Sequence, residues 1–424
     1  MVKISKNQIQ NGQNKYKFKK HNKQEAIKTL KKLINIDTDI NNLTRKDFNN
    51  KYLLFIPSGN KEFNFSFLQK ALENYGLSQA DMDSSSRLNL TFIWHILFES
   101  EKEDKPTFKT QKTYYNTLCY LSNALDKYNN ISEKDLLYLN LRKMFPNEYS
   151  NILAKSFLLT KKTKYNPNDI LIAKPVNFLS SLEINKKFQA CAGYDIIIIN
   201  SKSQLTNAQK LLNKYENILV SKYIKNPLLF KTKKFHLRLC FIISIIDYKF
   251  NSYLLDTMRI VTAKLPYKFA DFKNRDIHDT HLASTEKDYY FPEDFTTQNM
   301  SIPITSEIIL TLWDKIRDIM KKVAMVACNS SNHIKLFPNH KNAFHMFGPD
   351  IMIDENFNPI LLEVNSNPTF KRVDKTNTFL DEKIFNLIDD VILHPIFSPN
   401  TIHKPKSGHM AMKSLYSSKM ENIY

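Results

Sequence analysis

The segment 344–368 constrains this chain more than any other part of its sequence. Two apolar runs, residues 350–354 and 359–365, stand on either side of a turn-forming Glu-Asn-Phe-Asn sequence. Apolar runs joined through a short polar turn are typical of an antiparallel β-hairpin. The sequence therefore predicts a hairpin that carries acidic groups among its apolar side chains.

The expected register brings three oxygen-bearing side chains together. If the loop is four residues long, Asp354 faces Pro359 and, counting outward, Asp350 faces Glu363. Asn365 projects from the same face as Glu363, because side chains alternate along a strand. Opposed carboxylates repel unless something neutralises them, and Mg²⁺ or Mn²⁺ binds carboxylate and amide oxygens. Spacing alone leaves two interpretations open, a metal site or a solvated acidic face of the hairpin.

Composition sets the broad class of protein. The chain has 424 residues, enough for a sizeable core in two or three domains, and its 42% apolar share is typical of a folded protein. The formal net charge of +19 indicates an acidic partner, which could be nucleic acid, an anionic membrane or an acidic protein tail. An AT-rich genome, which enriches Lys, Asn and Ile, is the alternative explanation of this charge.

The cysteines and the apolar runs indicate a location. The four cysteines are far apart and form no Cys-X-X-Cys pair, so neither a zinc site nor a disulfide framework is expected. The N-terminal residues have no apolar run typical of a signal peptide, and the run 239–246 is too short to span a bilayer. We therefore expect a cytoplasmic protein with no membrane partner.

Hydrophobic periodicity predicts an α/β chain. Helical spacing covers residues 65–75, 108–128, 204–215 and 308–326. A further helix is expected to begin near Ser132, which with Asp135 resembles a capping box. Strand-like runs cover residues 52–56, 170–175, 196–199, 218–224, 234–241 and 253–262.

Cations line one face of the strand 234–241. Lys234, His236 and Arg238 alternate with apolar residues, and Arg259 follows on the next strand. A row of cations on a sheet face is either a solvated exterior or the wall of an anion site. From this segment alone, the solvated exterior is the expectation.

Several motifs then occur in a characteristic order along the chain. They are IPSGN, EKDLLYLNLRKMF, LIAKP, VSKYIKNPLLF, KKFHLRL, the strand with Arg259, DTHLAS, and the hairpin FGPDIMIDENFNPILLEVNSNP. This ordered set resembles the tubulin tyrosine ligase-like family of the ATP-grasp superfamily, over residues 52–395. The resemblance implies an α/β (α+β) ATP-grasp fold of three sub-domains, with nucleotide between the central and C-terminal sheets.

Composition and the resemblance together predict a domain organisation. Polar and basic composition predicts a flexible arm over residues 1–30 and a flexible tail over 397–424. Between them we expect an N-terminal domain over 31–163, a central ATP-grasp domain over 164–230 and a C-terminal ATP-grasp domain over 231–396.

The activity that the resemblance implies is ATP-dependent ligation of tyrosine, glutamate or glycine to a protein carboxylate. ATP would phosphorylate the acceptor carboxylate, and the α-amine of a free amino acid would displace phosphate from the acyl phosphate. The acceptor would be the acidic tail of tubulin or of another protein, which suggests association with microtubules. Nucleic acid is not an expected partner, because the chain has no recognisable nucleic-acid module.

Site residues follow from the matching motifs. Asp350, Glu363 and Asn365 look like ligands of Mg²⁺ or Mn²⁺. Lys174 resembles the lysine that contacts the ATP phosphates, and Lys134 resembles a second nucleotide-contacting lysine. The hinge strand that holds adenine is expected to consist of Lys222, Tyr223 and Ile224.

The remaining predicted site residues lie on the cationic strands. Arg238 and Arg259 would meet the γ-phosphate and the acceptor carboxylate, and Lys234 would steer that carboxylate. His236 belongs to the same catalytic group and stands where the family commonly has an aspartate.

Other positions also depart from the family pattern. The family places a glycine-rich loop after the lysine of LIAKP, whereas residues 176–192 contain no glycine and only Gly193 follows. Ala283-Ser284 stands where Thr-Asn is usual. Glycine lets the backbone approach phosphate closely. The alternative prediction is therefore a catalytically degenerate family member that binds ATP or tubulin.

Overall fold

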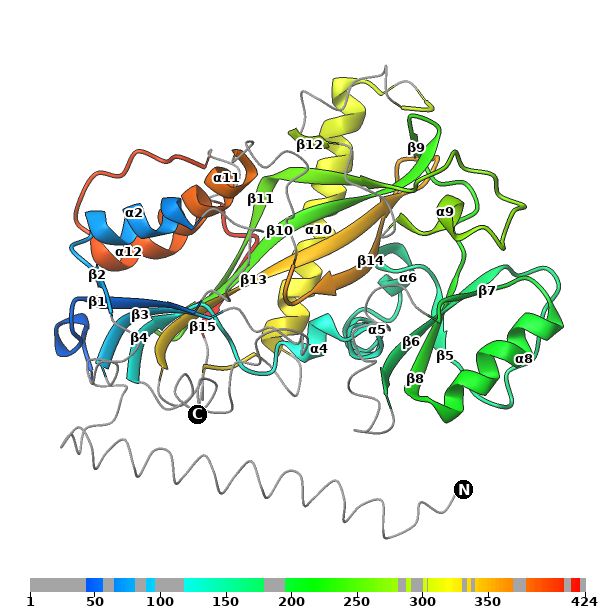
Figure 1. Cartoon of the computed structure of the whole chain (residues 1–424), viewed down its shortest axis with the longest axis horizontal. Coiled ribbons are helices and arrows are strands. Elements are labelled where there is room, and N and C mark those ends of the chain that lie inside the picture. Colours follow the sequence, from blue (N-terminus) through cyan, green and yellow to red (C-terminus); the bar gives the residue numbers. More distant parts are fainter. Residues whose placement is uncertain are drawn as a thin grey trace, which may run out of the picture.

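Two β-sheets and the helices packed on them organise the chain (Figure 1). The computed structural model describes residues 43–55, 65–80, 89–95, 118–178, 195–280, 287–290, 300–302, 304–329, 334–336, 340–368, 379–407 and 413–419. The expected arm over residues 1–30, Gly193 and the pair Ala283-Ser284 lie outside these ranges. No helix within them combines the length and hydropathy that crossing a bilayer requires.

The large sheet joins N-terminal and C-terminal parts of the chain. Its order is β12-β11-β10-β13-β4-β3-β1-β2, while β14, β15 and β9 pair with β13, β11 and β10. β13 pairs in parallel with β4, so residues more than two hundred positions apart lie side by side. The strands are β1 (Lys51–Phe55), β2 (Ser78–Gln79), β3 (Asn89–His95), β4 (Leu118–Ser122), β9 (Leu229–Phe230), β10 (Lys233–Ile246), β11 (Lys249–Thr262), β12 (Lys287–Tyr290), β13 (His340–Ile353), β14 (Pro359–Asn365) and β15 (Tyr416–Lys419).

The small sheet is antiparallel, with the order β5-β8-β6-β7. Its strands are β5 (Ser156–Leu158), β6 (Leu171–Phe178), β7 (Ile197–Ile199) and β8 (Tyr215–Lys222). The helix α8 (Lys202–Lys210) packs Leu205 and Ala208 against the sheet, in one core with Val220. The prediction that this helix reaches Tyr215 was wrong: Tyr215 begins β8, where its buried hydroxyl donates to Asp195 Oδ2 over 2.6 Å.

A long helix supports the large sheet. The predicted amphipathic helix is confirmed as α10 (Ser306–Asn329), which contacts β11, β14 and α5 (Lys134–Met144). Its buried side includes every residue expected there from spacing, namely Ile309, Leu312, Ile316, Ile319, Met320 and Val323. The shorter elements are η2 (Arg45–Asp47), α2 (Ser66–Asn74), α4 (Asn129–Ser132), α6 (Tyr149–Ile152), η5 (Leu211–Asn213), α9 (Arg275–His278), α11 (Phe379–Ile388), a π-helix η8 (Asp389–Leu393) and α12 (His394–Phe397).

Two local predictions were wrong. The helix expected over 108–128 is not formed in its described part, because β4 occupies Leu118–Ser122. All five residues of β4 are buried between neighbouring strands, so the segment lacks the alternation that normally identifies a strand. Ser132 does not cap the next helix either: Glu133 is the N-cap residue, and the Asp135 carboxylate instead accepts a hydrogen bond from Asn217 Nδ2 over 2.7 Å.

Two turns confirm expectations from the sequence. Asp247 and Tyr248, between β10 and β11, have φ of 45° and 61°, which is the left-handed geometry of a type I′ hairpin turn. Gly76 ends α2 with φ of 76°, and its N–H donates to the Glu73 carbonyl over 2.9 Å.

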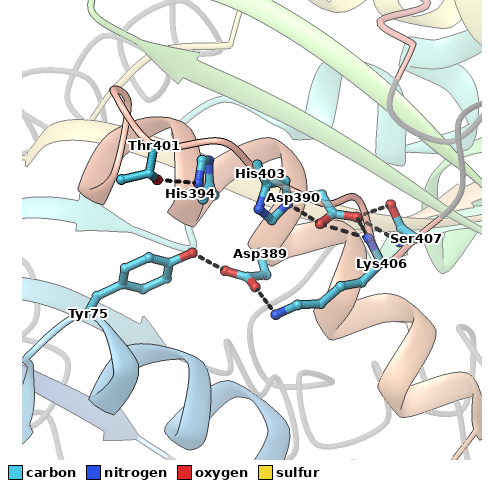
Figure 2. Close-up of polar contacts among 8 residues, drawn as sticks. All are labelled: Tyr75, Asp389, Asp390, His394, Thr401, His403, Lys406 and Ser407. Carbon is cyan, nitrogen blue, oxygen red and sulfur yellow. Dashed lines mark hydrogen bonds and ion pairs between the residues drawn. The ribbon is translucent and has the colours of Figure 1, made fainter.

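Buried aspartates fasten the chain after α12 to the body of the protein (Figure 2). Asp389 accepts hydrogen bonds from the Tyr75 hydroxyl (2.7 Å) and from Lys406 Nζ (2.8 Å). Asp390 accepts from His403 Nε2 and from the N–H (2.7 Å) and hydroxyl of Ser407. Further on, β15 pairs with β11. The expected flexible tail is therefore attached in its described part, through contacts that composition does not reveal.

We expect Asp390→Asn to lower the free energy of unfolding by about 2–3 kcal/mol. The amide would turn N–H groups toward donors of His403 and Ser407, which leaves buried donors unsatisfied. Urea unfolding followed by circular dichroism measures the change. Asp318→Asn is the matched control, because Asp318 lies on the exposed side of α10. Equal stability of the two variants would contradict the anchoring role.

Candidate active site

A row of charged side chains crosses four adjacent strands of the large sheet. Glu363 on β14 lies opposite Asp350 on β13, Asp350 lies opposite Arg238 on β10, and Arg238 lies opposite Arg259 on β11. All four residues are buried. We call these four residues the charged row. Burial of four charges in one row is costly unless each is paired, so the row is a strong candidate for a functional site.

A β-bulge sets the acidic end of the charged row. The prediction that Asp354 faces Pro359 was wrong by one residue, because Ile353 is the partner of Pro359. The register then shifts between Asp350 and Ile351, and Leu362 has no partner across the hairpin. This extra residue compensates for the first error, so Asp350 does face Glu363.

The three predicted metal ligands come together at this end. Asp350 accepts hydrogen bonds from Arg238 Nε and, over 2.9 Å, from Arg238 Nη2, while Lys134 Nζ lies 2.9 Å from Glu363 Oε2. The Asn365 amide donates to Glu363 Oε1 over 3.2 Å and lies 3.4 Å from Asp350 Oδ2. Among the described residues, no group of three or more His, Cys, Asp or Glu side chains could hold a metal ion. A metal here would therefore need the amide oxygen of Asn365 as well as the two carboxylates.

Gly348 permits the close packing behind this cluster. A Cβ at this position would lie 2.5 Å from Pro368 Cβ and 3.1 Å from Arg238 Cδ. The Gly348 carbonyl also accepts a hydrogen bond from Asn365 Nδ2 over 3.1 Å. Glycine at residue 348 thus leaves the space that Pro368 and the Arg238 side chain occupy.

The cationic face of β10 is buried. Lys234, His236 and Arg238 are 5%, 0% and 9% exposed, so the prediction of a solvated exterior was wrong. The segment that follows β11 covers this face, since His236 Nδ1 lies 2.7 Å from the Thr280 hydroxyl. His236 Nε2 lies 3.5 Å from Asp350 Oδ1. Burial acts to lower the pKa of Arg238, but the Asp350 carboxylate outweighs it, so this pKa is raised.

A pocket lies beside the charged row, between the two sheets. On one side β6 and β8 contribute Ile172 and Leu219, and on the other the hairpin contributes Met352 and Leu361. Figure 1 shows the small sheet and α5 on the side of the large sheet where β14 lies. The part of the pocket lined by Ile172, Leu219, Met352 and Leu361 is apolar, which suits a flat organic ring.

Lysines supply the charge of the pocket. Lys134, Lys174 and Lys234 all line it. Burial lowers the pKa of Lys174, and Lys134 acts in the same direction while Glu363 opposes it. Burial, together with the charge of Lys174, lowers the pKa of Lys234 to about 7. The two lowered pKa values mean that Lys174 and Lys234 are short of negative charge, which an anionic ligand would provide.

The predicted hinge residues border the same pocket. Lys222, the last residue of β8, and the two residues that follow it, Tyr223 and Ile224, line it. The Tyr223 N–H donates to the Ile170 carbonyl over 2.8 Å, so the hinge is tied to the start of β6. Lys222 is exposed at the mouth, whereas Tyr223 is buried.

Sequence reasoning did not identify one wall of the pocket. Phe272, Arg275, His278 and Asp279 line it from the segment between β11 and β12. This segment is polar and has no periodicity, so nothing in its sequence indicates which face it covers. The available signal was the DTHLAS motif, which begins at Asp279 directly after the other three residues.

Comparison with known proteins identifies the family. Residues 108–402 match the model of the tubulin-tyrosine ligase family, and this match covers more than half of the chain. The chain therefore belongs to the tubulin-tyrosine ligase family. This is the family that the ordered motifs resemble.

Two relatives are similar to this chain in sequence. A probable tubulin–tyrosine ligase of Schizosaccharomyces pombe is 28% identical over 200 residues, which is 46% of this chain and 47% of that protein. A probable alpha-tubulin polyglutamylase of Tetrahymena thermophila is 25% identical over 261 residues, covering 58% of each chain. The matched region thus spans about half the length of these relatives.

A solved structure shows the fold. The C-terminal domain of Pby1 from K. lactis, described as an ATP-grasp enzyme that interacts with the mRNA decapping enzyme Dcp2, superposes with a TM-score of 0.59 at 16% identity. The superposition covers 86% of this chain and 98% of that domain. The predicted α/β ATP-grasp fold is therefore confirmed.

We expect Gly348→Ala to destabilise the protein by about 1–3 kcal/mol, because the new methyl group must displace Pro368 and Arg238. Thermal unfolding followed by calorimetry measures this effect. Gly76→Ala is the matched control: a Cβ there meets nothing within 4 Å, so only the backbone cost of φ at 76° applies, about 1 kcal/mol. A smaller loss for Gly348→Ala than for Gly76→Ala would contradict the close-packing argument.

Proposed function

We propose that this chain is an ATP-dependent ligase that joins an amino acid to a protein carboxylate through an acyl-phosphate intermediate. The observation that carries this proposal is the charged row, because it sets two carboxylates and two arginines in register beside a lysine-lined pocket. Membership of the tubulin-tyrosine ligase family supports the ligase class. The names of the relatives, a probable tubulin–tyrosine ligase and a probable alpha-tubulin polyglutamylase, favour tubulin over another acidic protein as the acceptor.

ATP is the nucleotide that the pocket would take. The apolar walls formed by Ile172, Met352 and Leu361 suit the adenine ring, with the hinge 222–224 at its edge. Lys134 and Lys174 would then contact the phosphates, since both lie near Glu363 at the acidic end of the charged row. The triphosphate would also supply negative charge beside the buried Lys174, whose pKa burial lowers.

Asp350, Glu363 and Asn365 would hold Mg²⁺ or Mn²⁺. The donor set fits a hard cation, because it consists of carboxylate and amide oxygens on adjacent strands. When bound, the ion supplies neutralisation of phosphate charge. The Asn365 amide would rotate to present its oxygen in place of the N–H groups that now bond to the carboxylates.

The proposed reaction has two steps. An oxygen of the acceptor carboxylate attacks the γ-phosphorus, the bond to the β,γ-bridging oxygen breaks, and ADP leaves. The α-amine of the amino acid then attacks the acyl carbon, phosphate leaves with the electrons of the C–O bond, and the nitrogen gives up a proton. Such transfers depend on positioning and charge stabilisation more than on a covalent nucleophile.

The cations of β10 and β11 would position the reacting groups and stabilise their negative charge. Arg238 and Arg259 face each other across the strands, and opposed like charges repel, which favours an anion next to them. We assign them to the γ-phosphate and the acceptor carboxylate. Lys234 would steer that carboxylate, and His236 would hold Asp350 and Thr280 in their relative positions.

The net charge of +19 supports an acidic protein tail as acceptor, because it would steer such a tail toward the surface. A tubulin substrate would place the protein in the cytoplasm with microtubules. The added amino acid would be tyrosine, glutamate or glycine.

We expect Glu363→Gln to lower the rate of ligation by at least about 100-fold while the fold stays intact, because one anionic ligand is lost without a change in volume. Single-turnover ligation and circular dichroism measure the two effects. Glu355→Gln is the matched control on the same hairpin, since Glu355 is exposed and its carboxylate accepts a hydrogen bond from Asn226, which does not line the pocket. Normal ligation by Glu363→Gln would refute the site assignment.

A second candidate is a binding protein of this family that has lost catalysis. It is favoured by His236, where the family commonly has an aspartate, and by the glycine-free segment 176–192. The deciding experiment incubates the protein with tubulin, Mg²⁺-ATP and isotope-labelled amino acids, followed by mass spectrometry of the tubulin tails. We expect an added mass that identifies the amino acid. Retained ATP binding in calorimetry with no added mass would favour the binding protein.

A further inference from the structure

A chain of hydrogen bonds leads from the pocket into the segment that forms its unpredicted wall. Lys234 Nζ lies 3.0 Å from the Tyr223 hydroxyl, and this hydroxyl lies 2.7 Å from His278 Nδ1. His278 Nε2 in turn lies 2.9 Å from the carbonyl oxygen of Asp271. Lys234, Tyr223 and His278 all line the pocket, so the chain begins at a surface that a ligand can touch.

With a neutral imidazole, the contacts of His278 fix the positions of the protons along this chain. The Asp271 carbonyl can only accept, so His278 Nε2 carries the proton and Nδ1 is an acceptor. The Tyr223 hydroxyl then donates its single proton to Nδ1. Its oxygen lone pairs are left for Lys234, which can only donate when charged.

The surroundings of His278 keep its ring neutral and fixed. The ring stacks on Phe272, with centroids 5.8 Å apart and an angle of 14° between the planes. Tyr267 meets it edge-on at 5.7 Å, and the Tyr267 hydroxyl donates to the Lys225 carbonyl next to the hinge. Burial lowers the pKa of His278, and the charge of Lys234 acts in the same direction although the Asp271 carbonyl opposes both. The imidazole is therefore held in the form that accepts from Tyr223.

Lys234 depends on the acceptor that this arrangement provides. Burial next to Lys174 lowers its pKa to about 7, so its charged form needs a hydrogen-bond partner near neutral pH. The Tyr223 oxygen is that partner, and the face of the same ring lies 4.4 Å from Nζ. Without the imidazole acceptor, the Tyr223 hydroxyl would turn its proton toward the Tyr267 oxygen, and its lone pairs would no longer be directed at Lys234.

We propose that His278 is a positioning residue, which orients the Tyr223 hydroxyl so that its lone pairs hold Lys234 charged and directed into the pocket. The inference rests on the proposed function, in that the ligand which Lys234 meets is ATP. His278 and Tyr223 act through Lys234, and neither role follows from the family motifs. The proposal implies that Lys234, Tyr223 and His278 act as one unit. The losses of ATP affinity caused by substituting Tyr223 and His278 are therefore not additive.

Calorimetric titration of the full chain with Mg²⁺-ATP tests this proposal. His278→Phe keeps an aromatic ring against Phe272 but removes the acceptor, and Tyr223→Phe removes only the hydroxyl. We expect each to raise the Kd about 10-fold, as loss of a hydrogen bond to a charged group does. The double variant should bind no more weakly than either single variant, whereas independent contributions would multiply.

Two further variants separate positioning from simple loss of structure. His278→Asn places an amide oxygen near the position of Nδ1, so we expect its Kd to return to within about threefold of the original protein. Tyr165→Phe is the control for Tyr223→Phe, because the Tyr165 hydroxyl donates to the Asn200 carbonyl over 2.7 Å outside the pocket, and its Kd should not change. If His278→Phe fails to fold, Tyr223→Phe and His278→Asn still decide the question.

The outcomes distinguish this inference from the proposed function. A folded original protein that does not bind ATP overturns the proposed function and this inference with it. ATP binding that is unchanged in Tyr223→Phe overturns the inference alone. So do losses that multiply in the double variant, or a His278→Asn variant as weak as His278→Phe.

Discussion

The buried ion pair between Arg238 and Asp350 is the interaction on which the rest of the site depends. Both side chains are almost inaccessible to solvent, and a buried carboxylate or guanidinium without a partner costs several kcal/mol. The pairing requires β10 and β13 to keep one register along their length. A shift of one strand by one residue would place the two side chains on opposite faces of the sheet, where they could not pair. The bulge in the hairpin then places Glu363 next to the pair, and the absence of a side chain at Gly348 leaves room for it.

The second sheet and the helices turn this charged row into a site. The small sheet lies across the hairpin and closes a pocket whose walls are partly apolar and partly cationic. The start of α5 brings Lys134 to within 2.9 Å of Glu363, and α10 supports α5 from the other side. The segment after β11 covers the cations of β10 through Thr280 and His278. Charge, apolar surface and shielding from water thus come from separate parts of the chain, which meet only in the folded protein.

Much of the candidate site could be inferred from local patterns together with the family's motifs. The turn chemistry and strand alternation around residues 350–365 predicted that Asp350 faces Glu363. The predicted register was wrong by one residue at Pro359, and the β-bulge between Asp350 and Ile351 compensates for that error. The role of the cations on β10 could not be predicted from their own segment, because alternation identifies a face without revealing what covers it. The strand β4 was mistaken for a helix for a related reason: burial on both faces removes the alternation that identifies a strand. The division into three sub-domains stays a prediction.

The sequence by itself determined the acidic hairpin, the alternating faces of β10, the amphipathic side of α10 and the order of motifs that marks the family. These depend on neighbours within a few positions, where backbone geometry sets which side chains share a face. Only the tertiary structure decided that Arg238 pairs with Asp350, 112 positions away, and that Lys234 lies buried beside Tyr223 and His278. The physical reason is that burial, charge pairing and pKa depend on what packs against a residue, and those partners come from distant parts of the chain.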